Sequence, residues 1–176
     1  MSIRRVVTGV REGKAVIVQD GPVETYGFET IPGATQTNFW GTDGPPENVG
    51  ASKEIQIDSI LPPALGSRFM IIDIPPDSAA QTAEFDPIAA AQEYKTALGD
   101  FADCFEPDAP GMHTTPTLDY GFVISGTPVL ELDDGQAVAL NPGDVVVQCR
   151  TRHAWRNPSS EPAKMLFVLL GEKPDG

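Results

Sequence analysis

The two histidines of this chain, His113 and His153, are the residues whose types and spacing most clearly indicate chemistry. Positions 113, 115 and 119 alternate along one segment, so in an unbroken strand they would face the same side, although Pro116 predicts a break among them. Positions 153, 155 and 157 alternate in the same way on a later strand. If both sets face the inside of one barrel, His113, Asp119 and His153 converge. Two imidazoles and one carboxylate form a set typical of mononuclear iron(II) sites with open positions. The spacing therefore predicts a metal site.

The segment around the first histidine resembles the first motif of the cupin superfamily. His113 matches the first histidine of that motif, and Gly126 matches its closing glycine. Asp119 stands at the glutamate position, whereas Thr115 stands where a second histidine is usual. A neutral hydroxyl is a poor ligand for a divalent ion, so a water molecule would fill that place.

The segment around the second histidine resembles the second cupin motif. Residues 142–144 (Pro-Gly-Asp) open it, His153 matches its histidine and Asn157 its asparagine. Gln148 and Arg150 stand at its proline and glycine positions, with one residue fewer before them than is usual. The resemblance covers residues 111–170 and implies a cupin-type barrel with one site for a divalent metal ion (Fe, Mn, Zn or Ni).

The whole chain also resembles an uncharacterised group of bacterial and fungal single-domain cupins. That resemblance implies a β-barrel with an N-terminal strand-rich extension, often exchanged in a dimer, and no settled substrate. It depends on four stretches, namely residues 4–9 (RRVVTG), 39–44 (FWGTDG), 118–121 (LDYG) and 153–157 (HAWRN).

Three arginines, at positions 150, 152 and 156, surround His153 in a chain of net charge −13. They indicate either an electropositive barrel mouth for a carboxylate or phenolate substrate, or exposed side chains paired with acids. The parity of Arg152 and Arg156 is opposite to that of His153, so we expect both to face outward. Arg150 is the better candidate for the mouth, and an arginine there costs about 1 kcal/mol if the turn needs a positive φ. The predicted substrate-binding residues are Thr115, Arg150, Trp155 and Asn157.

The elements that must position these residues are mostly short strands. Seventeen glycines and seventeen prolines disfavour a helical bundle. One helix is expected at residues 88–98, with Asp86 as N-cap and Gly99 at its end. A hairpin is expected from strands 3–8 and 14–19 with a turn at Gly9–Gly13. Further strands are expected at residues 35–42, 68–74, 119–125, 128–133, 136–140, 144–149, 153–157 and 163–170.

Regularly spaced strands of this kind predict an all-β fold, a cupin-type double-stranded β-helix or jelly-roll barrel with an N-terminal strand extension and one short helix. The expected division is a strand-rich extension at residues 1–64, a barrel at 65–172 and a tail at 173–176. The apolar N-terminal strands, which have no core of their own, predict a homodimer.

Composition narrows the function. An acidic chain repels phosphate backbones, which argues against nucleic acid as a partner. We found neither a membrane-spanning stretch nor a secretory signal, so the expected setting is cytoplasmic. Two hypotheses stay open: a metal-dependent enzyme acting on a small oxygenated, anionic or aromatic metabolite by lyase, isomerase or dioxygenase chemistry, or a metal-free small-molecule-binding cupin.

Overall fold

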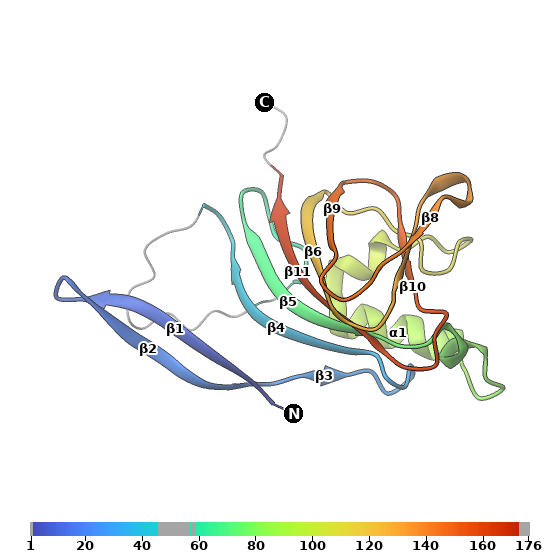
Figure 1. Ribbon diagram of the computed structural model, residues 1–176, viewed down its shortest axis with the longest axis horizontal. Helices are drawn as coiled ribbons and strands as arrows, with labels where there is room; N and C mark the ends of the chain where they lie inside the picture. The colour runs from blue at the N-terminus through green and yellow to red at the C-terminus, as the bar shows by residue number, and fades with distance from the viewer. Residues whose placement is uncertain (1, 46–56, 58, 173–176) are drawn as a thin grey trace.

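The computed structural model describes residues 2–45, 57 and 59–172 (Figure 1). One α-helix, α1 (Pro87–Leu98), accompanies the strands of this part of the chain. The strands are β1 (Ile3–Arg11), β2 (Lys14–Val23), β3 (Tyr26–Gly27), β4 (Thr35–Thr42), β5 (Ser67–Ile74), β6 (Thr117–Ser125), β7 (Val129–Glu131), β8 (Ala137–Ala139), β9 (Val145–Cys149), β10 (Ala154–Arg156) and β11 (Ala163–Gly171). The strands expected from residue 35 onward are all confirmed within a few residues.

Two sheets form the body of the molecule. The larger one has the order β3-β4-β5-β11-β6-β9, and the smaller one has the order β10-β7-β8. Every strand pairing in both sheets is antiparallel. Figure 1 shows the large sheet curving around the small one and α1. The predicted all-β jelly-roll architecture with one short helix is confirmed.

The core lies between the two sheets. On β6 the buried positions alternate with partly or fully exposed ones from Thr117 to Val123, so one face of the strand points inward. Strand β11 shows the same alternation. The buried core residues are Phe28, Ala34, Ile60, Met70, Leu98, Val123, Leu140, Met165, Phe167 and Leu169.

Helix α1 begins and ends where the sequence predicts. The Asp86 side chain accepts hydrogen bonds from the backbone N–H groups of Ile88 (2.9 Å) and Ala89 (3.1 Å), and Pro87 occupies the first helical position. Gly99 ends the helix with φ of 59°. The helix buries Leu98 in the core, so it closes one side of the space between the sheets.

The N-terminal hairpin differs from its prediction. Its turn is Glu12–Gly13, both with positive φ (52° and 75°), and Gly9 lies inside β1, paired with Val16. A two-residue turn of this kind matches the twist of long antiparallel strands, so the hairpin extends further than expected. Residues 20–23, expected as loop, belong to β2.

The division at residues 64/65 stays a prediction, as does the rest of the domain scheme. Strands β3 and β4 precede that boundary, yet β4 pairs with β5 over its whole length and belongs to the same sheet. The predicted tail at 173–176 lies outside the described residues. In the described part of the chain, none of the helices has the length and apolarity needed to span a bilayer.

Candidate functional site

His113 and His153 lie side by side although they come from distant segments. The His113 N–H donates to the His153 carbonyl over 2.9 Å, and the His153 N–H donates to the His113 carbonyl over the same distance. This antiparallel bridge brings the two ring centroids to 4.2 Å from each other. The structure therefore confirms that the two predicted histidines meet.

Each imidazole is oriented by a backbone carbonyl two residues earlier. His113 Nδ1 lies 3.0 Å from the Gly111 oxygen, and His153 Nδ1 lies 2.9 Å from the Thr151 oxygen. Because a carbonyl only accepts, Nδ1 carries the proton in both rings, and in the neutral form each Nε2 keeps a free lone pair. This is the arrangement that orients histidine toward a metal ion or another electrophile.

Glycine at position 111 makes the first of these contacts possible. Gly111 adopts φ of +81°, and a Cβ at this position would come within 2.8 Å of Arg156 Nη1. A larger residue would shift the carbonyl that holds His113.

Both histidines are buried in aromatic surroundings, and both are neutral at pH 7. The exposed fraction is 6% for His113 and 2% for His153. Burial, together with the charge of the neighbouring His153, lowers the pKa of His113 to about 4, and burial also lowers the pKa of His153. Phe105 packs on His113 at 4.8 Å, and Trp155 contacts His153 edge-on at 6.0 Å.

Asp119 points into the barrel from β6. Its Oδ1 is buried and has no hydrogen-bond partner among the described residues. Burial raises the pKa of this carboxyl to about 6, partly opposed by the Thr117 hydroxyl, so the carboxylate still predominates at pH 7. A buried carboxylate oxygen without a partner is costly unless something binds it.

The donor chemistry of these residues suits a divalent ion, but the geometry gathers only two of them. No three His, Cys, Asp or Glu side chains within the described ranges lie close enough together to hold a metal ion. The structure thus pairs His113 with His153 and does not place Asp119 in one set with them. Each Nε2 nevertheless keeps the free lone pair that an imidazole ligand offers to a metal ion.

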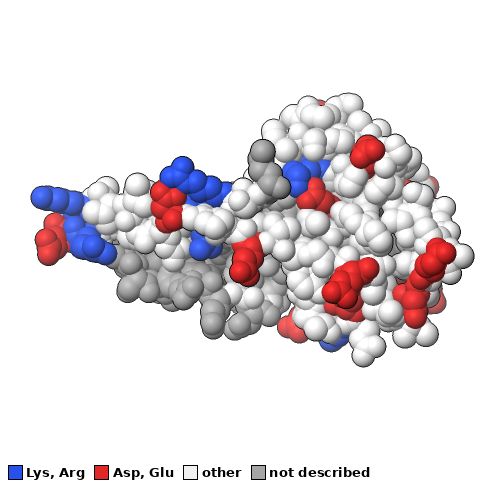
Figure 2. All heavy atoms as spheres, turned by 90° about the horizontal axis from the view of Figure 1, so that it is seen from below, with Lys and Arg blue, Asp and Glu red and all other residues white. Residues whose placement is uncertain are grey.

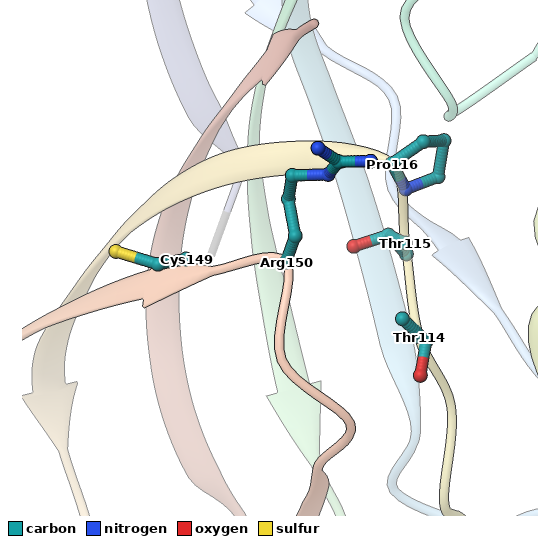
Figure 3. A pocket seen from close by; sticks show the side chains of 5 residues that line it. All are labelled: Thr114, Thr115, Pro116, Cys149 and Arg150. Carbon is teal, nitrogen blue, oxygen red and sulfur yellow. The ribbon is translucent and has the colours of Figure 1, made fainter.

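An open hollow of about 490 Å³ is lined by Thr114, Thr115, Pro116, Cys149 and Arg150 (Figure 3). Figure 3 shows the Thr115 hydroxyl directed toward the Arg150 side chain. Thr115 Oγ1 also accepts a hydrogen bond from Thr117 Oγ1 over 2.8 Å. Arg150 has φ of 55°, so the condition under which an arginine at the motif's glycine position is costly is met, and its Nη1 lies 2.5 Å from Glu172 Oε1.

The other two arginines are paired with acids. Arg152 binds Glu106 through two nitrogens, both at 2.7 Å, and Asp133 through a third at 2.8 Å. Arg156 binds Glu131 at 2.5 Å. For these two residues the alternative interpretation, pairing with acids, is confirmed.

Asn157 and Trp155 stabilise the structure around the site, the first by hydrogen bonds and the second by packing. The Asn157 amide donates to the carbonyls of Ile74 (2.9 Å) and Glu161 (2.8 Å), and its oxygen accepts from both N–H and hydroxyl of Ser159. These bonds use every donor and lone pair of the amide and leave none for a ligand. Trp155 packs on His153 and on Phe167 of the core.

Sequence reasoning missed Gln148 as a support of the site. Its buried side chain donates from Nε2 to the Thr151 carbonyl over 3.0 Å, the same oxygen that receives His153 Nδ1–H. The available signal was parity, because Gln148 alternates with the outward-facing Val147 on β9.

Comparison with known proteins agrees with the motifs. Residues 104–169 match the family model described as cupin domain. For this stretch of the chain, the resemblance to the cupin superfamily that was inferred from the two histidine motifs is confirmed.

Relatives in fungi match about a third of the chain. "Oryzines biosynthesis cluster protein J" of Aspergillus oryzae is 44% identical over 66 residues, 37% of each chain. "Phomopsin biosynthesis cluster protein C'" of Diaporthe leptostromiformis is 47% identical over 36% of this chain and 34% of its own. "Cupin-domain-containing oxidoreductase fogC" of Aspergillus ruber is 44% identical over 35% of this chain and 34% of its own. The match spans only about a third of the length of these relatives.

Solved structures of low sequence identity include a Cupin_2 domain of an XRE family transcriptional regulator from Enterobacter cloacae. It is 18% identical, with a TM-score of 0.38 over 62% of this chain and 83% of its own. The DMSP lyase DddQ from Ruegeria pomeroyi is 15% identical, with a TM-score of 0.37 over 62% of this chain and 41% of its own.

Proposed function

We propose that this protein is a metal-dependent cupin enzyme of oxidoreductase type, acting on a small oxygenated metabolite. His113 and His153 are the proposed ligands of one divalent ion (Fe, Mn, Zn or Ni). The observation that carries the proposal is the orientation of both rings, which give Nδ1–H to carbonyls and keep each Nε2 lone pair free. A metal ion held there would supply Lewis acidity toward a carbonyl or enolate oxygen.

Asp119 is the proposed third ligand, and this role requires it to move toward the histidine pair, because the described geometry does not gather the three side chains in one set. Its Oδ1 is a buried acceptor without a partner among the described residues, and a cation is the partner that best offsets the cost of burying that charge. Thr115 is proposed to contact substrate, since this residue lines the hollow beside Arg150.

Arg150 supports an anionic substrate. Its side chain is half exposed at the hollow and has one carboxylate partner, Glu172, whereas Arg152 pairs with both Glu106 and Asp133 and is less exposed. A substrate carboxylate or phenolate can replace Glu172 at this guanidinium without breaking any packing.

The names of the relatives support the reaction class. Four of the matched fungal proteins are named cupin-domain-containing oxidoreductases, and others are named as biosynthesis cluster proteins. As part of the proposal, we extend to this chain both the oxidoreductase class and a role in biosynthesis. Lyase and isomerase reactions would use the same metal ligands, and they remain alternatives to the oxidoreductase class.

A metal-free binding protein is the second candidate. The packing of Phe105 on His113 and of Trp155 on His153 is what favours it, because buried histidines among aromatic rings also occur as core residues. Such a protein would hold an apolar or aromatic ligand in the barrel.

Elemental analysis combined with thermal unfolding separates the two candidates. The metal enzyme predicts a stoichiometric ion in the purified full chain and a higher melting temperature on addition of Fe, Mn, Zn or Ni. An ion at 100 times its Kd stabilises the fold by about 2.7 kcal/mol. No stoichiometric ion and no shift with any of the four would contradict the proposal and favour the binding protein.

A further inference from the structure

The histidine pair is closed off from the hollow beside Arg150. Neither His113 nor His153 lines that hollow, and both side chains are buried. A small molecule or ion can reach their Nε2 atoms only if some segment of the chain moves aside.

One side of His113 is covered by a segment that belongs to none of the sheets. Helix α1 continues directly into the short 3₁₀ helix η2 (Gly99–Cys104), and together they join β5 to β6 (Figure 1). Phe101 of η2 contacts the His113 ring edge-on, with 5.4 Å between the ring centroids. We call residues 87–104 the cover segment.

His153 is covered differently. The aromatic ring that contacts it edge-on belongs to Trp155 of β10, and β10 is held by its pairing with β7. Movement of the cover segment would therefore uncover His113 and leave this neighbour of His153 in place.

The two ends of the cover segment are held to different degrees. Beyond its C-terminal end, Phe105 forms a β-bridge with His113, and the Glu106 N–H donates to the Met112 carbonyl over 2.9 Å. Before its N-terminal end, residues 82–84 are exposed and belong to no helix or strand. The segment can therefore rotate about its anchored C-terminal end while the exposed residues follow.

A single carboxylate, that of Glu93 on α1, joins the cover segment to the loop after β3. It accepts hydrogen bonds from the backbone N–H groups of Glu29 (2.7 Å) and Thr30 (2.8 Å). It also accepts from the hydroxyls of Thr30 and Tyr26. These bonds are charge-assisted, so they are stronger than bonds between neutral groups.

Other side chains of the cover segment do not share this role. The side-chain hydrogen bonds of Lys95, Thr96 and Cys104 all stay within the segment. The remaining contacts with the body are apolar, such as Tyr94 edge-on against Phe28 at 5.0 Å and Leu98 in the core. Apolar contacts are non-directional, so the Glu93 bonds are what fixes the closed position.

The loop that receives Glu93 has its own internal hydrogen bonds. The Phe28 N–H donates to the Ala34 carbonyl over 3.1 Å, and the Ala34 N–H donates to the Ile31 carbonyl over 3.0 Å. Successive backbone N–H groups that point to one place form a binding site for an anion. The loop therefore offers a preformed seat for the Glu93 carboxylate.

This contact uses no basic side chain. Figure 2 shows Lys and Arg mainly along the projecting hairpin, and Asp and Glu across the body. The partners of Glu93 are N–H and O–H groups alone, so the strength of the contact depends on the geometry of the loop.

We infer that the cover segment is a hinged lid over the histidine pair and that Glu93 is the latch that holds it closed on the loop after β3. Opening withdraws Phe101 from His113. The closed state predominates because it also buries apolar side chains, and the latch sets how often the segment opens. The inference rests on the proposed function for what enters the site, whereas the movement itself needs no metal.

Carbethoxylation of the metal-free chain with diethyl pyrocarbonate tests the inference. The reagent modifies neutral imidazole, the chain has two histidines, and peptide mapping by mass spectrometry distinguishes them. Glu93→Ala is expected to raise the rate at His113 about tenfold, the equivalent of about 1.4 kcal/mol in the opening equilibrium. The rate at His153 should rise much less, because Trp155 stays in place.

Two further variants control the experiment. Glu29→Ala removes a neighbouring carboxylate but keeps the N–H that donates to Glu93, so it should retain the rate of the unaltered chain. Glu93→Gln keeps the size and one acceptor oxygen, so its rate at His113 should lie between those of the unaltered chain and Glu93→Ala. It also serves as the test if circular dichroism shows that Glu93→Ala does not fold.

An unchanged rate at His113 in the folded Glu93 variants overturns the inference. Equal acceleration at both histidines overturns it as well, because that pattern indicates global destabilisation rather than local opening. Selective acceleration at His113 in a chain that binds no metal would contradict the proposed metal enzyme and still support the lid.

Discussion

The backbones of His113 and His153 are joined by two hydrogen bonds of 2.9 Å, and this bridge ties together segments 40 residues apart in the chain. Each ring then turns back to a carbonyl of its own segment, so the two Nε2 atoms are oriented by the same kind of contact. Neither imidazole depends on the other side chain for its tautomer. Loss of one ring therefore leaves the second correctly oriented, and the two can be tested separately.

Removing either histidine should remove the metal. We expect His113→Ala and His153→Ala each to lower metal affinity by about 100-fold or more, since loss of a mere supporting partner already costs ~10–100-fold. Thr115→Ala should leave affinity nearly unchanged, because a hydroxyl competes poorly with water as a ligand. The measurement is a titration of each metal-free variant with metal ion, monitored by calorimetry. Full metal retention in the double histidine variant would exclude this site.

Gln148 should behave as a positioning residue. Gln148→Ala removes the donor that fixes the Thr151 carbonyl, the acceptor of His153 Nδ1–H. We expect metal affinity to fall about 10-fold while the fold persists. Val147→Ala, the outward-facing neighbour on β9, is the control and should keep the affinity of the unaltered chain. Equal affinity in both variants would show that Gln148 does not orient the site.

Arg150→Gly should stabilise the protein and weaken anion binding. Arg150 has φ of 55°, a region that costs a side chain about 1 kcal/mol and glycine nothing. Chemical denaturation is expected to show a gain of ~0.5–1 kcal/mol, whereas affinity for keto or aromatic acids should fall. Arg152→Gly, which loses contacts with Glu106 and Asp133, should instead destabilise. Unchanged acid binding in Arg150→Gly would remove this residue from the substrate site.

The strands were predictable because turns separate them so clearly. The segment Asp133-Asp134-Gly135 predicts a tight hairpin, and the structure places Asp134 and Gly135 at positive φ (55° and 72°) between β7 and β8. The histidine pair was predictable from the spacing of the two cupin-like motifs, although both residues lie in an isolated bridge outside the named strands. The hairpin turn was misplaced because two glycines compete for it, and only pairing across the strands decides between them.

The supporting contacts of the site were not predictable from spacing. The Gly111 and Thr151 oxygens that hold the rings are backbone atoms, which every residue has, so no residue type marks them. The ion pair between Arg152 and Glu106 joins positions 46 apart and depends on the tertiary fold. The parity of Arg152 relative to His153 predicts that its side chain faces outward, but it does not predict which acidic residue pairs with it.

Asn157→Ala should destabilise the fold rather than alter ligand binding. The substitution removes a fully buried side-chain amide that donates to the carbonyls of Ile74 and Glu161 and accepts from Ser159. An unsatisfied buried polar group costs about 1–3 kcal/mol, so a loss of at least that size is expected in urea unfolding. Ser159→Ala removes only part of the same network and should cost less. A stable Asn157→Ala variant with weakened ligand binding would return this residue to the substrate site.

The metal-free protein should lose stability in acid because of its histidines. The pKa of His113 falls from 6.5 in the unfolded chain to about 4 in the folded one, so only the unfolded chain takes up a proton between these values. Stability therefore decreases as the pH drops from about 6.5 to 4. Asp119 acts in the opposite direction, because its pKa rises from 3.8 to about 6 on folding. Its contribution to stability is full below pH 3.8 and is lost as the pH rises to about 6.

Asp119→Asn isolates the second of these effects. When a chelator removes all metal, the free energy of unfolding of the variant should exceed that of the unaltered chain by about 1–3 kcal/mol above pH 6. This difference should vanish near pH 4. The measurement is urea unfolding at several pH values between 4 and 8. With saturating metal the order should reverse, because the carboxylate then has a cation as its partner and the amide binds metal less well. A variant that is more stable than the unaltered chain both with and without metal would leave Asp119 as a buried charge that the fold tolerates, and would remove it from the proposed ligands.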